Sequence, residues 1–239
     1  ATTSTVGLLV GFALLGAITF LPLFQQVVRG LGPTESGLQL LPLMGGLIVS
    51  SVVCGQLITH LGRYRVFPIL GTAVAGVGLA LLSTMGPQTS VVEMGVYMLI
   101  LGVGLGMVMQ VLTLAVQNAV PYSELGVATA GNTLFRSIGG ALGTALLGAV
   151  FANRLAANLI SDLPPGTGDG AVSQGAVEPA HLDTLAPDVR AGYLEAFSGA
   201  MGTVFLVAAV FMAGAFVVAW FIREVPLRTT VRGGPEADD

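Results

Sequence analysis

The sequence predicts an all-α membrane protein whose six transmembrane helices form one bundle. Of its 239 residues, 54% are hydrophobic and only 9% are charged, whereas an ordinary soluble domain has about 25% charged residues. The charged residues are also clustered, which leaves long uncharged intervals between them. These intervals are too long and too continuously apolar for the alternating strands of an outer-membrane barrel.

The uncharged intervals locate the helices, because a membrane-spanning helix needs about 20 mostly apolar residues and charges resist burial in hydrocarbon. Five intervals contain no Asp, Glu, Lys or Arg, and a sixth contains only Arg136. We therefore predict helices at about residues 5–28, 37–60, 66–84, 92–119, 125–154 and 192–222.

Residues that start or end helices stand between these segments. Gly and Pro residues close the first helix at 30–33 and the third at 85–87, and Pro121 opens the break between the fourth and fifth. Between the last two helices we predict a long loop over 155–191, whose Pro187 can begin a helix that extends the sixth span. The bundle then covers 1–222, and 223–239 form a tail.

Arginine positions predict the orientation, since cytoplasmic loops are enriched in Lys and Arg. An even number of spans places both ends of the chain on one side. If that side is the cytoplasm, five arginines lie inside (63, 65, 223, 228 and 232) and three lie outside (29, 154 and 190). We therefore expect cytoplasmic termini and an extracytoplasmic loop at 155–191.

Two stripes of small and polar residues mark the fourth and fifth predicted helices. Their spacing of three or four residues puts each stripe on one helix face; the first comprises Gly102, Gly106, Gln110, Thr113 and Gln117, and the second Asn132, Arg136, Gly140, Thr144 and Gly148. The glycines Gly102, Gly106, Gly140 and Gly148, with Thr144, are candidates for close helix packing. Because the two helices run antiparallel, we expect the stripes to meet each other. Packing seams and a cavity wall are both consistent with this pattern.

The first helix adds Gln25 and Gln26 near its outer end, together with Phe20 and Phe24. The third and sixth helices hold few polar side chains, which predicts a wet cavity lined by helices one, two, four and five, with three and six facing lipid. The candidate cavity residues are Phe20, Phe24, Gln25, Gln26, Gln110, Thr113, Gln117, Asn132 and Arg136. For the phenylalanines, ordinary packing is the alternative. For Arg136, the alternatives are a latch between helices and contact with a substrate or coupling group.

The segment Gly55-Gln-Leu-Ile-Thr-His-Leu-Gly-Arg-Tyr-Arg65 resembles the cytoplasmic loop motif of the major facilitator superfamily. Gly55, Leu57, Gly62 and Arg63 match the motif. Thr59 replaces its acid, His60 replaces its first base, and Arg65 stands one place late. The glycines permit a tight turn, and the cations favour the inner membrane surface.

Two further segments resemble the fourteen-helix drug:proton antiporters of that superfamily: residues 30–37 running into Leu41-Pro42, and residues 132–143. The resemblance implies that the chain is the C-terminal half of a multidrug efflux transporter, a six-helix bundle built as a 3+3 inverted repeat. It also implies a cell-membrane location and three partners besides the lipid bilayer: a missing N-terminal six-helix bundle, protons, and a lipophilic or amphipathic small molecule. The uncharged intervals contain no carboxylate, and Glu93 and Glu124 fall at predicted helix ends, so we expect the coupling acid outside this chain.

Other functions find less support in the residues. The motifs of zinc proteases and serine hydrolases are absent, so we predict no enzyme, catalytic residue, metal or cofactor. The net charge of -4 provides no basic surface for nucleic acid. The alternative to a half-transporter is a self-contained membrane scaffold or assembly subunit, or a homodimeric half-carrier. Since the chain starts at Ala1, close to the first span, we expect further sequence before it.

Overall fold

A computed structural model describes residues 2–61, 64–162 and 186–222 of the chain. The described residues form helices without any strand: α1 Thr2–Arg29, α2 Pro33–Leu38, α3 Leu41–Leu61, α4 Val66–Leu82, α5 Val91–Ala119, η1 Tyr122–Glu124, α6 Leu125–Asp162 and α8 Pro187–Ala219. The prediction of an all-α membrane protein is confirmed. Most of the predicted loop at 155–191 and the whole tail at 223–239 lie outside the described residues.

Among the described residues, five segments are long and apolar enough to cross a membrane, and α4 is a shorter apolar helix of 17 residues. At 1.5 Å per residue α4 is about 25 Å long, close to the hydrocarbon thickness of about 30 Å. The 38 residues of α6 extend for about 57 Å, well beyond the membrane core. Arg154 stands 29 residues after the start of α6, about 44 Å along it, which explains how a helix can carry a charge there.

The predicted end of the fifth helix at 154 is wrong, because α6 continues to Asp162 and makes the first eight residues of the predicted loop helical. Two other helix ends differ from the predicted boundaries for reasons visible in the sequence. The segment predicted as one helix over 37–60 is divided into α2 and α3, with a break at residues 39–40. Pro42 lies just inside α3 and has no N–H to continue the hydrogen bonding of α2. α8 begins at Pro187, with the proline in the first turn, so it starts before the predicted residue 192.

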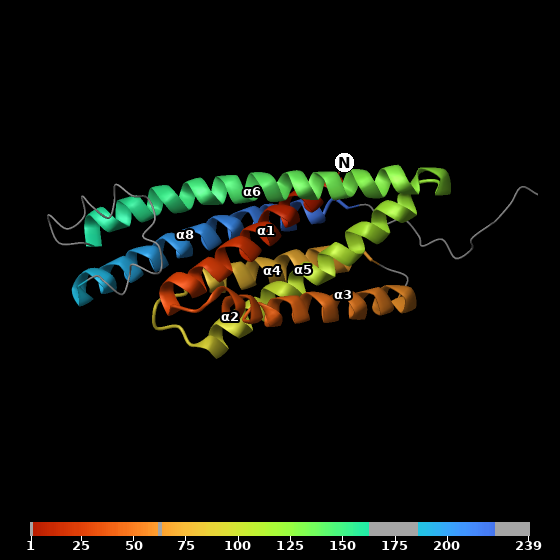
Figure 1. Cartoon of the computed structure of the whole chain (residues 1–239). Coiled ribbons are helices and arrows are strands. Elements are labelled where there is room, and N and C mark those ends of the chain that lie inside the picture. The colour runs from red at the N-terminus through yellow and green to blue at the C-terminus, as the bar shows by residue number, and fades with distance from the viewer. Residues whose placement is uncertain (1, 62–63, 163–185, 223–239) are drawn as a thin grey trace, which may run out of the picture.

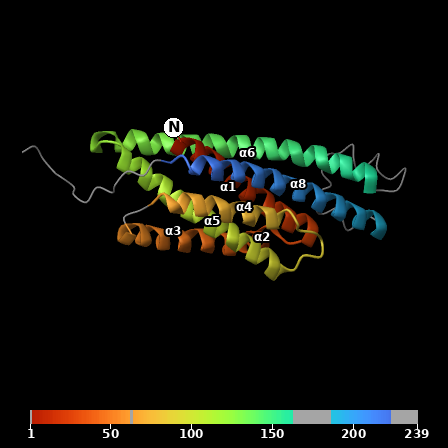
Figure 2. The same ribbon diagram turned by 180° about the vertical axis from the view of Figure 1, so that it is seen from behind.

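The helices form two layers (Figures 1 and 2). α5 packs against α3 and α4, α1 packs against α6 and α8, and α4 meets α8. Figure 1 shows α6 and α3 at opposite edges of the bundle with α1 and α5 between them. The front layer therefore runs α3, α5, α1, α6, and α4 and α8 form the back layer.

Small residues bring two parallel helix pairs into close contact. A side chain on Gly102 or Gly106 of α5 would overlap the carbonyl of Leu43 or Leu47 of α3, and one on Gly139 of α6 would overlap the carbonyl of Leu8 of α1. In each pair, a contact further along one helix is also further along the other, so the two helices run parallel. If α1, α3 and α4 form one three-helix unit and α5, α6 and α8 form the other, α1 corresponds to α5 and α3 corresponds to α6. The pair α1–α6 then corresponds to the pair α5–α3, as expected of a 3+3 repeat.

Large apolar side chains fill the space between the layers. α8 contributes Phe205 and Met212, and α5 contributes Met98, Leu101 and Leu105, all of them fully buried. At the α1–α8 contact the rings of Phe12 and Phe211 are stacked with centroids 4.2 Å apart. This core holds α1 and α5 in place, and the polar side chains on the outside of α5 are positioned by it.

Candidate functional site

One face of α5 is polar, exposed and directed away from the back layer. Val108 contacts α4 at Gly71, and Gln110 follows it by two residues. Two residues turn a helix by about 200°, so Gln110 points to the side opposite α4. Gln110 and Gln117 are both exposed and lie seven residues apart, on the same face. The front of α5 therefore presents two amides from the middle of the helix to its last turn.

The neighbouring helix α3 approaches this face through a glycine. A Cβ placed on Gly55 would lie 3.6 Å from Nε2 of Gln110, so the amide rests against α3 where no side chain intervenes. Thr113, which is half-buried, donates its hydroxyl to the carbonyl of Met109 within α5 at 3.2 Å. Thr113 is thus partly engaged by its own helix, and the two glutamines remain the accessible polar groups.

On the other side of the front layer, α6 holds Asn132 and Arg136 against α1. A Cβ on Gly7 would lie 3.0 Å from Oδ1 of Asn132, and one on Gly11 would overlap the carbonyl of Arg136. Asn132 is 7% exposed and its Oδ1 has no hydrogen-bond partner among the described residues. Arg136 is half-buried, and within the described ranges no hydrogen bond or ion pair involves its guanidinium.

Gln110 and Arg136 lie at similar depths in the bundle. α5 ends at Ala119 and α6 begins at Leu125, joined by a short connection. Gln110 stands nine residues before the end of α5 and Arg136 eleven residues after the start of α6, distances of about 14 and 16 Å along the two axes. From that connection the two helices diverge across the front layer (Figure 1).

Four further predicted cavity residues, all in α1, have partners within the bundle. Gln25 is completely buried, and its Nε2 donates to the sulfur of Met94 in α5 at 3.4 Å. Gln26 donates to the hydroxyl of Ser36 at 3.0 Å and so ties α1 to α2. The periodicity of α1 cannot distinguish a buried position such as Gln25 from a cavity wall, because core and cavity residues can share one helix face.

Phe20 and Phe24 are buried as well. The ring of Phe20 lies 6.0 Å from that of Phe151 in α6, and Phe151 meets Phe197 of α8 edge to face at 5.1 Å. Phe24 is fully enclosed by the core. In this structure both side chains pack helices together, the alternative that the sequence left open, and they do not reach the exposed front of the bundle.

The glycine stripes meet other helices than the ones predicted. Gly102 and Gly106 lie against α3, and Gly140 faces the side chain of Leu15 in α1. Thr144 donates to the carbonyls of Gly140 and Ala141 in its own helix, and a Cβ on Gly148 would meet nothing within 4 Å. The close contacts therefore join parallel helices within the front layer, α3 with α5 and α1 with α6, and do not join α5 to α6.

The loop motif is described in part. Gly55 is half-buried beside Gln110, Leu57 is exposed, and Arg65 donates from Nη2 to the carbonyl of Trp220 at 2.6 Å. Gly62 and Arg63 lie outside the described residues. Arg65 thereby links the start of α4 to the end of α8.

Sequence reasoning did not single out the α1 side of the front layer. Gly7 and Gly11, spaced by four residues, form the surface against which Asn132 and Arg136 pack. The small-xxx-small spacing of close helix pairs was the available signal. Asn158, also not singled out, donates to the carbonyl of Ala196 at 3.0 Å and joins α6 to α8.

The middle of the front layer offers hydrogen-bonding amides and the positive charge of Arg136. The described parts of the chain contain no group of His, Cys, Asp and Glu residues that could hold a metal ion. Glu93 lies in the first turn of α5 and accepts a hydrogen bond from Tyr97 at 2.6 Å, outside the amide stripe. Gln110, Gln117 and Arg136 thus offer donors and a cation to a bound molecule, without a nucleophile or an acid.

Comparison with known proteins agrees with the fold. Residues 2–144 match the family model described as Major Facilitator Superfamily. A Mycobacterium tuberculosis protein named as an uncharacterized MFS-type transporter is 40% identical over 228 residues, which cover 95% of this chain and 33% of the relative. The chain thus spans about a third of that relative's length.

Two further relatives have names that state a function. The multidrug transporter protein MdtP of Bacillus subtilis is 40% identical over 157 residues, covering 66% of this chain and 29% of MdtP. A tetracycline resistance determinant of Streptomyces rimosus is 33% identical over 254 aligned residues, covering 96% of this chain and 73% of the relative.

Proposed function

The chain belongs to the major facilitator superfamily, and we propose that it is the C-terminal six-helix bundle of a proton-coupled efflux transporter for lipophilic or amphipathic compounds. Because it belongs to this superfamily of transporters, the chain is a multi-pass membrane protein of the transporter class and not an enzyme. The observation that carries the proposal is the exposed amide stripe of α5, with Gln110 and Gln117 turned away from the back layer.

An exposed polar stripe on a membrane helix needs an aqueous or protein partner, because hydrocarbon offers amides no hydrogen bonds. An N-terminal six-helix bundle facing α1, α3, α5 and α6 supplies that partner and encloses a cavity between the two halves. The relatives named as a multidrug transporter and a resistance determinant support a drug as the transported molecule. Exposed apolar residues on the same face of α5, such as Val96 and Leu99 nearer the start of the helix, suit a ligand that is mostly apolar.

Proton coupling requires a group that titrates within the transport pathway. Three described acids, Glu35, Glu93 and Asp188, stand in the first turns of helices, where a carboxylate is favoured. The other three lie in the short connection after α5 (Glu124), at the end of α6 (Asp162) and at an exposed position near the start of α8 (Glu195). None of these six positions belongs to the amide stripe. The proposal therefore assigns the coupling carboxylate to the N-terminal bundle, and the termini of this bundle to the cytoplasmic side of the cell membrane.

Transport by inverted membrane vesicles tests the proposal. Vesicles containing the full-length protein should acidify on respiration, accumulate a lipophilic dye, and lose proton gradient when the dye is added. Vesicles that contain only this chain should take up none, because they lack an opposing bundle and a titrating acid. Uptake by the full-length protein that survives dissipation of the proton gradient would contradict proton coupling, and uptake by the chain alone would favour a homodimeric half-carrier.

A further inference from the structure

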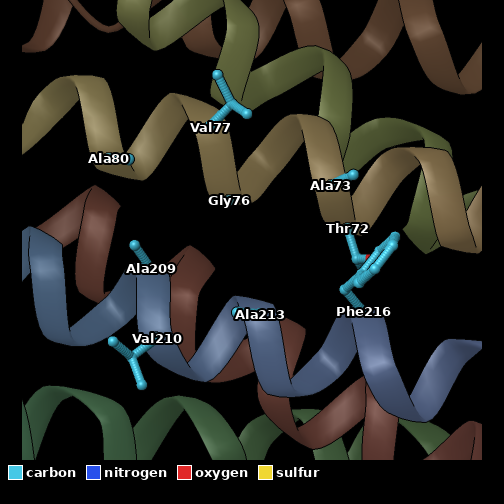
Figure 3. Close-up of a pocket in the computed structure, with 9 residues that line it drawn as sticks. All are labelled: Thr72, Ala73, Gly76, Val77, Ala80, Ala209, Val210, Ala213 and Phe216. Atoms are coloured by element: carbon cyan, nitrogen blue, oxygen red, sulfur yellow. The ribbon is translucent and has the colours of Figure 1, made fainter.

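A groove runs between α4 and α8 in the back layer (Figure 3). Its volume is about 390 Å³, and small side chains create its depth: Ala73, Gly76 and Ala80 from α4, and Ala209 and Ala213 from α8. Phe216 reaches from α8 towards Thr72 at one end. The hydroxyl of Thr72 donates to the carbonyl of Pro68 at 2.7 Å, so it adds no free polar group to the lining.

The groove is open on the outer surface of the bundle. Val77 and Val210 line it with exposed fractions of 54% and 64%, so no other described element covers them. Its floor is closed by the core, since a Cβ on Gly76 would lie 3.7 Å from Met212. In a multi-pass membrane protein, an apolar groove on this surface opens into the hydrocarbon of the bilayer.

A cation and an aromatic residue stand at the Phe216 end of the groove. Phe216 contacts the ring of Trp220 edge to face at 6.2 Å, and Trp220 is 54% exposed. Arg65 binds the carbonyl of Trp220 through Nη2, and its Nε has no acceptor among the described residues. No carboxylate in the described ranges forms an ion pair with this guanidinium. An exposed Trp beside an Arg that has no carboxylate partner among the described residues is the composition of a membrane–water boundary.

The distance between Arg65 and the groove matches the dimensions of a phospholipid. Arg65 directly precedes α4, and the groove residues Thr72 and Ala80 follow it by seven and fifteen residues. The groove therefore lies about 10 to 22 Å from Arg65 along the helix axis. One leaflet contains about 15 Å of hydrocarbon beneath about 6 Å of headgroup region. A phosphate beside Arg65 would thus place the acyl chain of the same lipid alongside the groove.

We propose that the protein binds an anionic phospholipid in this position, with its phosphate at Arg65 and one acyl chain in the groove between α4 and α8. The planar guanidinium donates to the phosphate oxygens, a geometry for which Arg is better suited than Lys. The small residues admit the chain, and Phe216 and Trp220 flank it below the headgroup. This site faces lipid, away from the amide stripe of α5, and does not depend on the transported substrate.

Trp220 is the only tryptophan in the chain, so its fluorescence reports on this site. The chain, purified into lipid nanodiscs, should be titrated with phosphatidylglycerol or phosphatidylcholine that carries bromine on its acyl chains. Bromine quenches a tryptophan that it contacts, and we expect stronger quenching by the anionic lipid. R65Q should reduce the preference for the anionic lipid about five-fold, the equivalent of about 1 kcal/mol for one cation near the membrane surface.

Filling the groove provides a test that does not involve the headgroup. A213L should lower quenching by both brominated lipids, because the added side chain occupies the place of the acyl chain. The matched controls are R154Q, at an arginine far along α6, and A145L, at another exposed alanine on α6. In both, the lipids should quench the Trp220 fluorescence as they do in the unchanged protein.

Equal quenching by both lipids in the unchanged chain, or an unaltered preference in R65Q, would overturn the proposal. Native mass spectrometry of the same samples distinguishes a second occupant. A dimer that A213L converts to a monomer would show that the groove holds a helix of a second copy, which would also overturn lipid binding.

Discussion

At the scale of single residues, the environment of each glutamine decides its role. Gln25 and Gln110 both lie in apolar helices, yet Gln25 is enclosed beside Met94 and Gln110 is exposed beside Gly55. In this bundle the amide of Gln25 contacts the core, whereas the amide of Gln110 is accessible to a ligand. The amides of Gln110 and Gln117 are therefore the residues on which substrate recognition should depend.

Replacing both amides by leucine keeps the side chains similar in size and removes their hydrogen bonds. In the full-length protein, Q110L/Q117L should change the efflux of compounds with hydrogen-bonding groups about five-fold, since one such bond contributes about 1 kcal/mol. Purely apolar compounds should be affected less. Drug susceptibility of cells with equal amounts of each protein is the measurement, and an unchanged profile for every compound would remove both residues from the pathway.

Arg136 presents two alternatives that one variant separates. Its guanidinium makes no hydrogen bond with a described residue, so R136L should not lower the thermal unfolding temperature of the chain, and the loss of a cation from a span should even favour insertion. In the full-length protein the same variant should reduce transport about ten-fold or more, as expected when a charged hydrogen bond to a ligand or acid is lost.

R136K serves as the matched variant because it keeps the charge and loses the planar fork. Full transport by R136K would indicate that the charge alone is needed, and partial transport would indicate that the planar fork contributes as well. A lower unfolding temperature in R136L with full transport would instead identify Arg136 as a structural latch.

At the scale of helices, two glycine seams define the front layer. Gly102 and Gly106 bring α5 onto α3, and Gly139 and Gly143 bring α6 onto α1. In lipid, where apolar surface gives little drive for association, close backbone packing of this kind contributes much of the contact between helices. The seams thus set the position of the amide stripe as well as the stability of the bundle.

G102A should destabilise the bundle by about 1–3 kcal/mol, because the added methyl overlaps the carbonyl of Leu43 in a packed interface. G148A is the control, since its Cβ meets nothing within 4 Å and alanine is the better helix former. Unfolding titrations in mixed detergent micelles measure both free energies. Equal stability of the two variants would show that the α3–α5 seam tolerates separation.

At the scale of the whole molecule, the bundle exposes two kinds of surface. The front layer carries amides and a cation, and the back layer carries an apolar groove with Arg65 at one end. A polar face and an apolar face need different neighbours in a membrane, which is why we assign the first to a second bundle and the second to lipid.

The predicted orientation can be tested with cysteine labelling. The lone natural cysteine, Cys54, is buried, and C54S supplies a background free of thiols. With cytoplasmic termini, cysteines at the exposed positions Thr34 and Gln88 should react in intact cells with a membrane-impermeant maleimide, and one at Ser123 should react only in inverted vesicles. The reverse pattern would invert the bundle.

The sequence determined the fold class, because charges excluded from hydrocarbon and about 20 residues per crossing leave few other structures. It also determined the turn at Gly30, where φ is 66°, and the helix start at Pro187, since both depend on local backbone chemistry. Only the tertiary structure decided that Gln25 and Phe20 face the core, that the glycine stripes meet α3 and α1, and that α4 and α8 leave a groove. Periodicity tells which residues share a helix face, but which neighbour covers that face depends on packing between segments far apart in the chain.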